Sequence, residues 1–160
     1  STQLLAQKGQ LSLSAGPLVS FPVDRFGENT KTGFGLEVNG QYGVSPKSSL
    51  IAQAALINYS AKTTYADTIQ NQFSVLNLNG GYRYQFGASG IYVNGLVGTE
   101  LDLSDGFASI AFTLGGGKRF TFNNGRQFDV GVDYLSAGVW VNALNLKVAL
   151  LLFKQQRSQD

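Results

Sequence analysis

The chain has 160 residues, with 12 Lys and Arg and 10 Asp and Glu, so one domain is the simplest organisation and the net charge of +2 implies no nucleic-acid partner. It contains no Cys and no His, which excludes disulfides and removes the usual general base and the commonest metal ligand. Charged residues make up 14%, well below the roughly 25% typical of soluble domains. The 20 Gly and 3 Pro favour many strands joined by tight turns rather than disorder.

The two ends of the chain are predicted to lie outside the folded domain. Residues 1–8, which include Leu4 and Ala6, are interpreted as an N-terminal arm or as the remnant of a signal peptide. Residues 154–160 form a polar C-terminal tail, and the domain itself covers residues 9–153. No run of about 18 apolar residues occurs, so a helix that spans a membrane is not expected.

Alternation of apolar and polar residues is the dominant pattern of the chain, and it is clearest over residues 77–86. Even positions there carry Leu78 and several aromatic side chains, whereas the odd positions are mostly polar and include Arg83. A period of two residues is typical of a β-strand with two unlike faces. Segments of this kind predict eight strands, at residues 9–17, 33–44, 49–59, 71–86, 91–101, 106–122, 127–134 and 140–152.

The connections between these segments differ in length along the chain. Residues 21–32 and 62–70 are expected to form longer loops. Residues 45–48 and 123–125 have the composition of tight turns. Every second connection is short, which is the pattern of an up-and-down barrel with turns at one end and loops at the other. The strand at 49–59 is apolar on both faces, so a β-bulge is expected within it.

The tight turn at residues 123–125 predicts the pairing of its two flanking strands. With a three-residue loop that ends in Gly125, Phe120 faces Phe128 and Arg119 faces Asp129. Cross-strand pairs of this kind stabilise a sheet by roughly 0.2–1 kcal/mol each. A slip of one residue would place an aromatic side chain beside a carboxylate, so the register is well specified.

The polar faces of the predicted strands carry four acidic and three basic residues, which can pair inside a closed barrel. The alternative is the water-facing surface of a soluble barrel, but the opposite face is almost continuously apolar and no helix is predicted to cover it. We therefore predict an all-β fold, a closed up-and-down antiparallel eight-stranded transmembrane β-barrel. The predicted structural charge network of the lumen comprises Arg83, Arg119, Asp129 and Lys147 toward the tight turns, Glu37 nearer mid-height, and Glu100 and Asp133 toward the loops.

Aromatic residues are expected to mark the two membrane interfaces, where amphipathic rings prefer to lie. By strict alternation Phe153 faces inward, unless the last strand contains a bulge. Lys118 falls on the lipid face, near enough to a turn for its ammonium group to reach the headgroups. The predicted interfacial residues are Tyr42, Tyr84, Phe86, Phe120, Phe128 and Phe153 at the tight-turn end, and Tyr134 and Trp140 at the other end.

In its alternation, loop asymmetry, interior charges and the aromatic Phe153 at the end of the last strand, the chain resembles the small eight-stranded bacterial outer-membrane barrels of the OmpA/OmpX type. The resemblance covers about residues 9–153. It implies a multi-pass protein of the bacterial outer membrane, with tight turns and both termini in the periplasm and the longer loops outside the cell. The partners that it implies are membrane lipid and other envelope proteins.

An enzyme is not expected, because barrels resembling deacylases or palmitoyltransferases depend on a histidine, which this chain lacks. Asp129 and Asp133 lie about 13 Å apart along one strand, too far to cooperate in acid–base chemistry. The preferred hypothesis is a non-enzymatic structural or accessory subunit that contacts partner proteins in the membrane, with the third strand and Lys118 as candidate contacts. A narrow pore or small-ligand conduit is the alternative, for which the inward glycines would leave room, and a soluble ligand-binding β-barrel is the second alternative. No catalytic, cofactor-binding or metal-binding residues are predicted.

Overall fold

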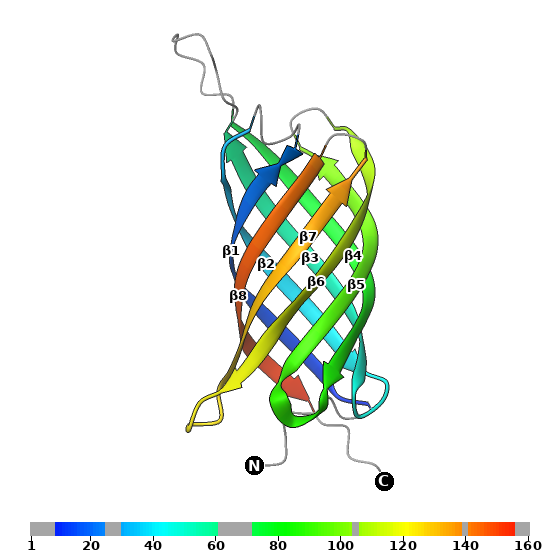
Figure 1. Ribbon diagram of the computed structural model, residues 1–160, viewed down its shortest axis with the longest axis vertical. Helices are drawn as coiled ribbons and strands as arrows, with labels where there is room; N and C mark the ends of the chain where they lie inside the picture. The colour runs from blue at the N-terminus through cyan, green and yellow to red at the C-terminus, as the bar shows by residue number, and fades with distance from the viewer. Residues whose placement is uncertain (1–8, 25–29, 61–71, 104–105, 139–140, 156–160) are drawn as a thin grey trace.

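The computed structural model describes residues 9–24, 30–60, 72–103, 106–138 and 141–155. Within these ranges eight strands form a closed barrel (Figure 1). The strands are β1 (Leu11–Val23), β2 (Gly33–Gly43), β3 (Ser48–Ser60), β4 (Gln72–Phe86), β5 (Ile91–Asp102), β6 (Ala108–Thr121), β7 (Gln127–Ala137) and β8 (Val141–Gln155), with the short helix η1 (Gly87–Ser89) between β4 and β5.

Each strand pairs antiparallel with its neighbours in sequence, and β1 closes the barrel by pairing with β8. A closed sheet has no free edge at which another strand could pair. The strands tilt and wrap around the barrel axis (Figure 1). The connections β2–β3, β4–β5 and β6–β7 meet at one end of the barrel, which we call the tight-turn end, and the opposite end is the loop end.

The alternation of the sequence separates the two faces of the barrel wall. Inward positions are buried and mostly polar or small, whereas outward positions are large, apolar and exposed. Leu114, near the middle of β6, is 70% exposed. Among the described residues no helix has the length and hydropathy of a membrane span. The fold is therefore turned inside out relative to a water-soluble protein, with its apolar surface outside and its polar groups inside.

The hairpin between β6 and β7 confirms the predicted register. Phe120 pairs with Phe128 and Arg119 pairs with Asp129. The Phe122 amide donates to the Arg126 carbonyl at 2.8 Å, which closes the loop. Gly125 adopts a φ of 82°, a backbone conformation that strongly favours glycine at this position.

Strand β3 differs from its prediction. It pairs with β2 and β4 in unbroken register, so the expected bulge is absent. Its second apolar face, which includes Ile51, Ile57 and Tyr59, points inward and is buried. For Ile57 and Tyr59 the physical reason is that the loop end of the lumen is itself apolar, so their inward position does not require a break in the alternation. Because this face is inside, it is also not a contact surface for a partner.

The bulge lies in β8 instead. Leu13 pairs with Phe153 and Ser14 pairs with Leu151, so Leu152 is the extra residue on this strand. Because of this bulge, Phe153 lies on the outer wall and is 51% exposed. The sequence predicted an outward Phe153 only if the last strand contained a bulge, and it does. β8 continues to Gln155, into the segment predicted as a tail.

Two further strands are longer than predicted, and both extend at the loop end. β1 continues through Pro22 to Val23, so residues 21–23 are strand rather than loop. β7 continues to Ala137, three residues beyond its predicted end at residue 134. In both cases the added residues pair with β8, a partner that a local pattern cannot reveal; Val23, for example, pairs with Asn142.

Candidate functional site

A cluster of charged side chains fills the lumen near the tight-turn end. Arg119 binds Asp129 through two hydrogen bonds, Nε to Oδ1 at 2.7 Å and Nη2 to Oδ2 at 2.9 Å. Arg83 binds the same carboxylate through Nη1, 3.1 Å from Oδ2. Paired two-point contacts between a guanidinium and a carboxylate are among the strongest polar contacts in proteins, so Asp129 is held from two sides.

Neutral side chains complete this arginine cluster. The Gln41 Oε1 atom accepts hydrogen bonds from Arg83 Nη1 and from Arg119 Nη2, both at 3.3 Å. Arg83 Nε donates to Asn94 Oδ1 at 2.7 Å, and its guanidinium carbon lies 3.9 Å from the centroid of the Tyr92 ring. The cross-section of the lumen is thus occupied by hydrogen-bonded and stacked groups. The prediction did not name Gln41 or Asn94 as part of the network, although their inward positions in the alternation were a usable signal.

A second charged cluster is built around Lys147 of β8 and includes carboxylates from β2 and β7. Its Nζ atom lies 2.5 Å from Asp133 Oδ2 and 3.1 Å from Glu37 Oε1. Asn39 Nδ2 also donates to Glu37 Oε1 at 2.6 Å, and Gln53 donates to the other Glu37 oxygen. One lysine therefore neutralises two buried carboxylates. This arrangement differs from the prediction, which grouped Lys147 with the arginines and put Asp133 toward the loops, because strand tilt moves inward residues out of the order expected from strand direction alone.

The loop end of the lumen is closed largely by apolar side chains. Leu18, Ile57 and Val75 belong to one buried cluster there, together with Tyr59, whose ring stacks on Phe73 with centroids 5.4 Å apart. The Tyr59 hydroxyl and the Ser20 hydroxyl form a hydrogen bond of 2.6 Å. A second apolar cluster comprises Ala111, Leu135 and Ala137. Glu100, the remaining predicted lumen charge, is buried but belongs to neither charged cluster.

The inward glycines do not leave the lumen open. A Cβ atom at Gly115 would lie 1.7 Å from Asp133 Oδ1. A Cβ atom at Gly117 would lie 2.6 Å from the Tyr92 hydroxyl and 2.3 Å from the Val130 carbonyl oxygen. The space that the sequence assigned to a conduit is therefore occupied by neighbouring side chains and strands. These glycines permit close packing.

The outer wall carries aromatic side chains near the tight-turn end. Tyr42, Tyr84 and Phe86 are exposed there, and the rings of Tyr84 and Phe86 meet edge to face with centroids 5.1 Å apart. Lys118 is exposed on the same wall, and its Nζ atom lies 5.2 Å from the centroid of the Phe120 ring. Of the remaining predicted interfacial residues, Phe120, Phe153 and Tyr134 are exposed and Phe128 is half-buried, whereas Trp140 lies outside the described residues.

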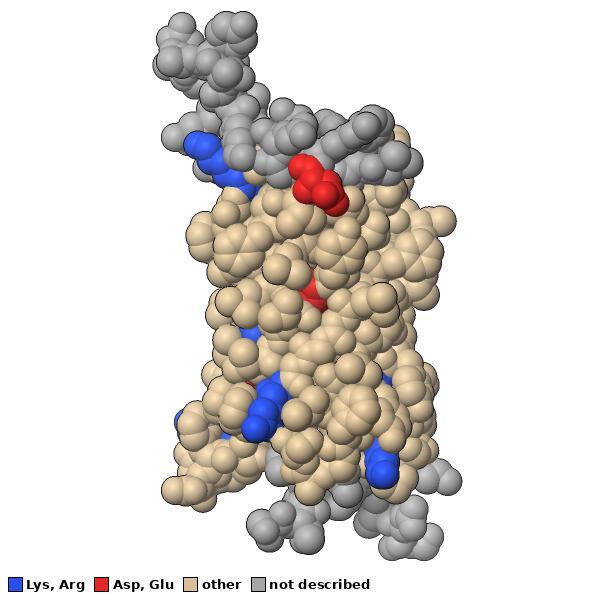
Figure 2. Space-filling model, viewed as in Figure 1, with Lys and Arg blue, Asp and Glu red and all other residues tan. Residues whose placement is uncertain are grey.

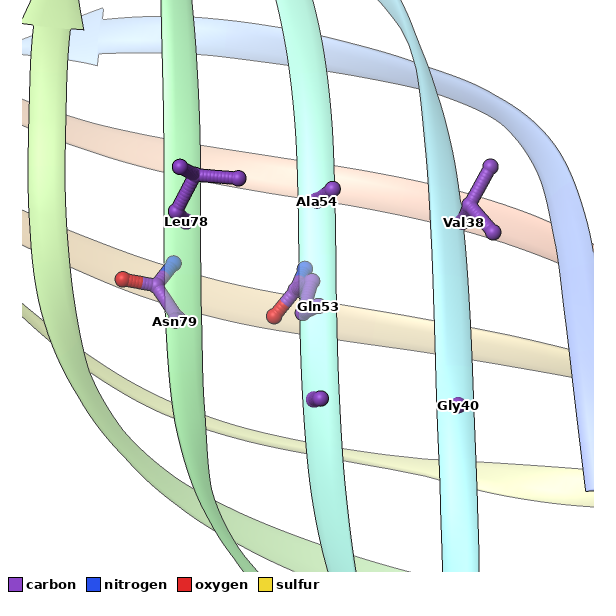
Figure 3. Close-up of a pocket in the computed structure, with 7 residues that line it drawn as sticks. Val38, Gly40, Gln53, Ala54, Leu78 and Asn79 are labelled. Carbon is purple, nitrogen blue, oxygen red and sulfur yellow. The ribbon is translucent and has the colours of Figure 1, made fainter. Parts of the chain in front are cut away.

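The outer wall is hollowed over β2, β3 and β4 (Figure 3). Val38, Ala54 and Leu78 stand side by side on the three strands, and the next row has Gly40 paired with Ala52, which in turn pairs with Gly80. A Cβ atom built on Gly40 would meet nothing within 4 Å, so no packing contact requires this glycine. We call this hollow of about 500 Å³ the wall depression. Its lining residues are Val38, Gly40, Ala52, Gln53, Ala54, Leu78 and Asn79.

Solved structures share the architecture of this barrel. Ail, the attachment invasion locus protein of Yersinia pestis, was solved in complex with the heparin analogue sucrose octasulfate and superposes with a TM-score of 0.65 at 17% identity, over 93% of this chain and 100% of that chain. The fold is that of a small outer-membrane β-barrel. OprG from Pseudomonas aeruginosa shares this barrel fold with a TM-score of 0.58 at 14% identity, over 94% and 97% of the two chains. A de novo designed transmembrane β-barrel shares it with a TM-score of 0.59 at 16% identity, over 92% and 99%.

No protein-family model matches the chain, and no curated protein matches it in sequence. The likeness therefore concerns the outer-membrane barrel fold. Among the residues that the structure describes, no group of three or more His, Cys, Asp and Glu side chains is arranged to hold a metal ion. The features of the barrel that bear on its function are the two charged clusters, the apolar loop end and the wall depression.

Proposed function

We propose that the protein is a non-enzymatic barrel of the bacterial outer membrane that acts as a structural or accessory subunit and contacts a partner protein through its outer wall. The observation that carries this proposal is the wall depression, an apolar hollow on a surface that faces lipid. The tight turns and both termini lie in the periplasm, and the longer loops lie outside the cell. Catalytic residues and cofactors form no part of this function.

The outer surface supports insertion into a bilayer. On the face shown in Figure 2, most of the surface at mid-height is uncharged, and the larger charged groups lie nearer the two ends. Large apolar side chains such as Leu36, Ile110 and Leu114 are at least 66% exposed on the outer wall. Burial of apolar surface is favourable by roughly 25 cal/mol per Å². In water such a wall would aggregate, so the soluble ligand-binding barrel is disfavoured.

The aromatic residues near the tight-turn end support the same placement. Tyr42 and Tyr84 present a polar hydroxyl on an apolar ring, the combination that suits a membrane–water interface. Lys118 lies beside the Phe120 ring near the same end, and a lysine on the lipid face is tolerated where its ammonium group reaches the headgroups. These residues support a membrane–water interface at the tight-turn end, and we propose that this interface is the periplasmic one.

The lumen supports a structural rather than a conducting role. Asp129 is clamped by Arg83 and Arg119, and Lys147 joins two strands by binding both Glu37 and Asp133. Buried ion pairs are strongly destabilised when one member is removed, so such clusters hold strands in one arrangement. We propose that the two clusters lock the barrel wall against which a partner packs.

The wall depression supports contact with a protein. Gly40, Ala52 and Gly80 have little or no side chain, and small residues of this kind allow another backbone to approach closely within a membrane. In the adjacent row, the larger side chains of Val38 and Leu78 flank Ala54 and border the hollow. An apolar transmembrane segment or another barrel wall fits a hollow of this chemistry better than a charged ligand does.

A photo-crosslinking residue placed at Ala52 tests this contact in intact outer membranes. We expect a protein adduct of one defined mass from position 52, and its loss when Gly40→Leu fills the hollow. Position 114 is the matched control, because Leu114 is exposed on β6 and outside the depression. Identical adducts from both positions, or none from position 52, would refute the partner contact.

A narrow conduit is a second candidate that one observation favours. Several buried amide oxygens in the lumen have no hydrogen-bond partner among the described residues, including those of Asn39, Asn77 and Asn145. Buried polar atoms of this kind are commonly satisfied by internal water. Single-channel recording in a planar bilayer distinguishes the candidates: a locked structural barrel gives no discrete openings, whereas a conduit gives reproducible steps that Asp129→Asn alters.

A further inference from the structure

The side chain of Glu100 differs from the other buried carboxylates of the lumen. Of the four buried Asp and Glu residues in the described part of the chain, Glu37, Asp129 and Asp133 each contact a cationic side chain. Glu100 is 7% exposed and makes no ion pair or hydrogen bond with any described residue. A buried carboxylate without a counter-charge is costly, so its surroundings should reveal what compensates it.

Glu100 faces further oxygen atoms. On one side it pairs with Asn77 of β4, and on the other with Ser109 of β6. Asn77 is 3% exposed, and its Oδ1 atom has no hydrogen-bond partner among the described residues. Directly opposed residues in a sheet have Cβ atoms about 4.5–5.5 Å apart, so the carboxylate and this amide oxygen can reach the same bound ion. Asp102 follows two positions later on the same face of β5.

The three basic side chains of the two charged clusters form ion pairs with carboxylates other than Glu100. Arg83 and Arg119 bind Asp129, and Lys147 binds Glu37 and Asp133. Glu100 lies near the loop end of β5. A carboxylate, an amide oxygen and a hydroxyl together form a set of hard oxygen donors, which is the chemistry that Ca²⁺ prefers.

We propose that Glu100 and Asn77 form the centre of a cation site at the loop end of the lumen, and that the site takes a hard divalent cation of the Ca²⁺ type. Ser109 supplies a further oxygen, Asp102 contributes a second negative charge nearby, and water completes the coordination. With so few charged ligands the affinity falls in the range of weak extracellular calcium sites, about 10⁻⁴ to 10⁻³ M. This inference does not depend on the wall depression or on a partner protein.

Terbium luminescence tests the site in the whole refolded protein, because Tb³⁺ accepts oxygen ligands like those of Ca²⁺ and is excited through a nearby tyrosine. Tyr59 lies close enough to Glu100 for the two groups to interact electrostatically, so it can serve as the donor. We expect saturable Tb³⁺ emission that Ca²⁺ displaces, and an apparent affinity at least tenfold lower in Glu100→Gln. Asp24→Asn is the matched control, since Asp24 is an exposed acid at the loop end of β1 and its loss should leave the affinity unchanged.

A second variant keeps the test decisive if Glu100→Gln fails to fold. Asn77→Asp adds a carboxylate beside Glu100 and should raise the affinity for Tb³⁺ and Ca²⁺ by about tenfold, while also increasing thermal stability in the presence of Ca²⁺. Heat-dependent electrophoretic mobility confirms that each variant is folded. Equal Tb³⁺ affinity in the wild type, Glu100→Gln and Asn77→Asp would overturn the proposal, as would a loss of binding in Asp24→Asn alone, because cations would then bind at the rim.

Discussion

Replacement of Lys147 by methionine tests whether the lumen clusters hold the barrel together. Methionine keeps the length and the apolar stem of lysine but removes the ammonium group that contacts both Glu37 and Asp133. These two carboxylates are 3% and 1% exposed, so water cannot replace the lost charge. The substitution thus leaves two buried acids without a cation while changing little of the packing.

The expected loss in free energy of unfolding is estimated from the distances between Lys147 and its two carboxylate partners. At 2.5 Å and 3.1 Å, unit charges at an effective dielectric constant of about 20 attract by roughly 5–7 kcal/mol per pair before desolvation is counted. The desolvation of all three groups offsets much of this attraction. Removal of one member of a buried ion pair is measured to cost about 3–5 kcal/mol. We therefore expect the free energy of unfolding to fall by about 3–5 kcal/mol in Lys147→Met.

Urea unfolding in lipid vesicles measures this change in the free energy of unfolding. The readouts are the fluorescence of the single tryptophan and the gel mobility of unboiled samples. Lys47→Met is the control, because Lys47 is exposed in the turn after β2 and its removal should be nearly neutral. The triple variant Lys147→Met, Glu37→Gln, Asp133→Asn should recover most of the lost stability, since no unpaired charge remains. A Lys147→Met variant that unfolds within about 0.5 kcal/mol of the wild type would refute the structural role of the cluster.

Three further outcomes are expected. Arg119→Met leaves Asp129 with Arg83 alone and should lower the free energy of unfolding by about 1–3 kcal/mol in the same urea assay; an unchanged transition would show that Arg83 suffices. Gly115→Ala should abolish the folded, heat-sensitive gel band, because its Cβ atom would overlap Asp133, whereas Gly40→Ala has open space and should fold normally; equal folding of both would contradict the close packing. Tyr59→Phe removes the hydrogen bond to Ser20 and should cost about 0.5–1.5 kcal/mol, and a stabilising effect would count against that bond.

The alternation along the chain was sufficient to predict which face of most strands lies inside. Side chains in a strand point to opposite faces in turn, so inward and outward sets can be separated without knowledge of the neighbours. The β6–β7 hairpin was also predictable to the residue, because a short loop determines the pairing of the strands that it joins. Local chemistry was enough in both cases.

The inward face of strand β3 could not be predicted from the local sequence pattern. Ile51, Ile57 and Tyr59 were ambiguous in sequence because both faces of the strand are apolar. Ile57 and Tyr59 face inward because the lumen is apolar at the loop end, where Leu18 from β1 and Val75 from β4 belong to the same buried cluster. The environment of an inward residue depends on strands distant in sequence, so it could not be read from β3 alone.

The pairing of charges was likewise decided only by the closed barrel. The sequence placed Glu37, Asp133 and Lys147 inside but at different heights, whereas strand tilt and the pairing of β8 with β1 and β7 bring them into one cluster. The same closure places a bulge at Leu152 and turns Phe153 to the outer wall. Which faces are polar is a local property of the chain. Which polar groups meet depends on how far each strand is shifted against the next, and that shift is determined by the whole circle of strands.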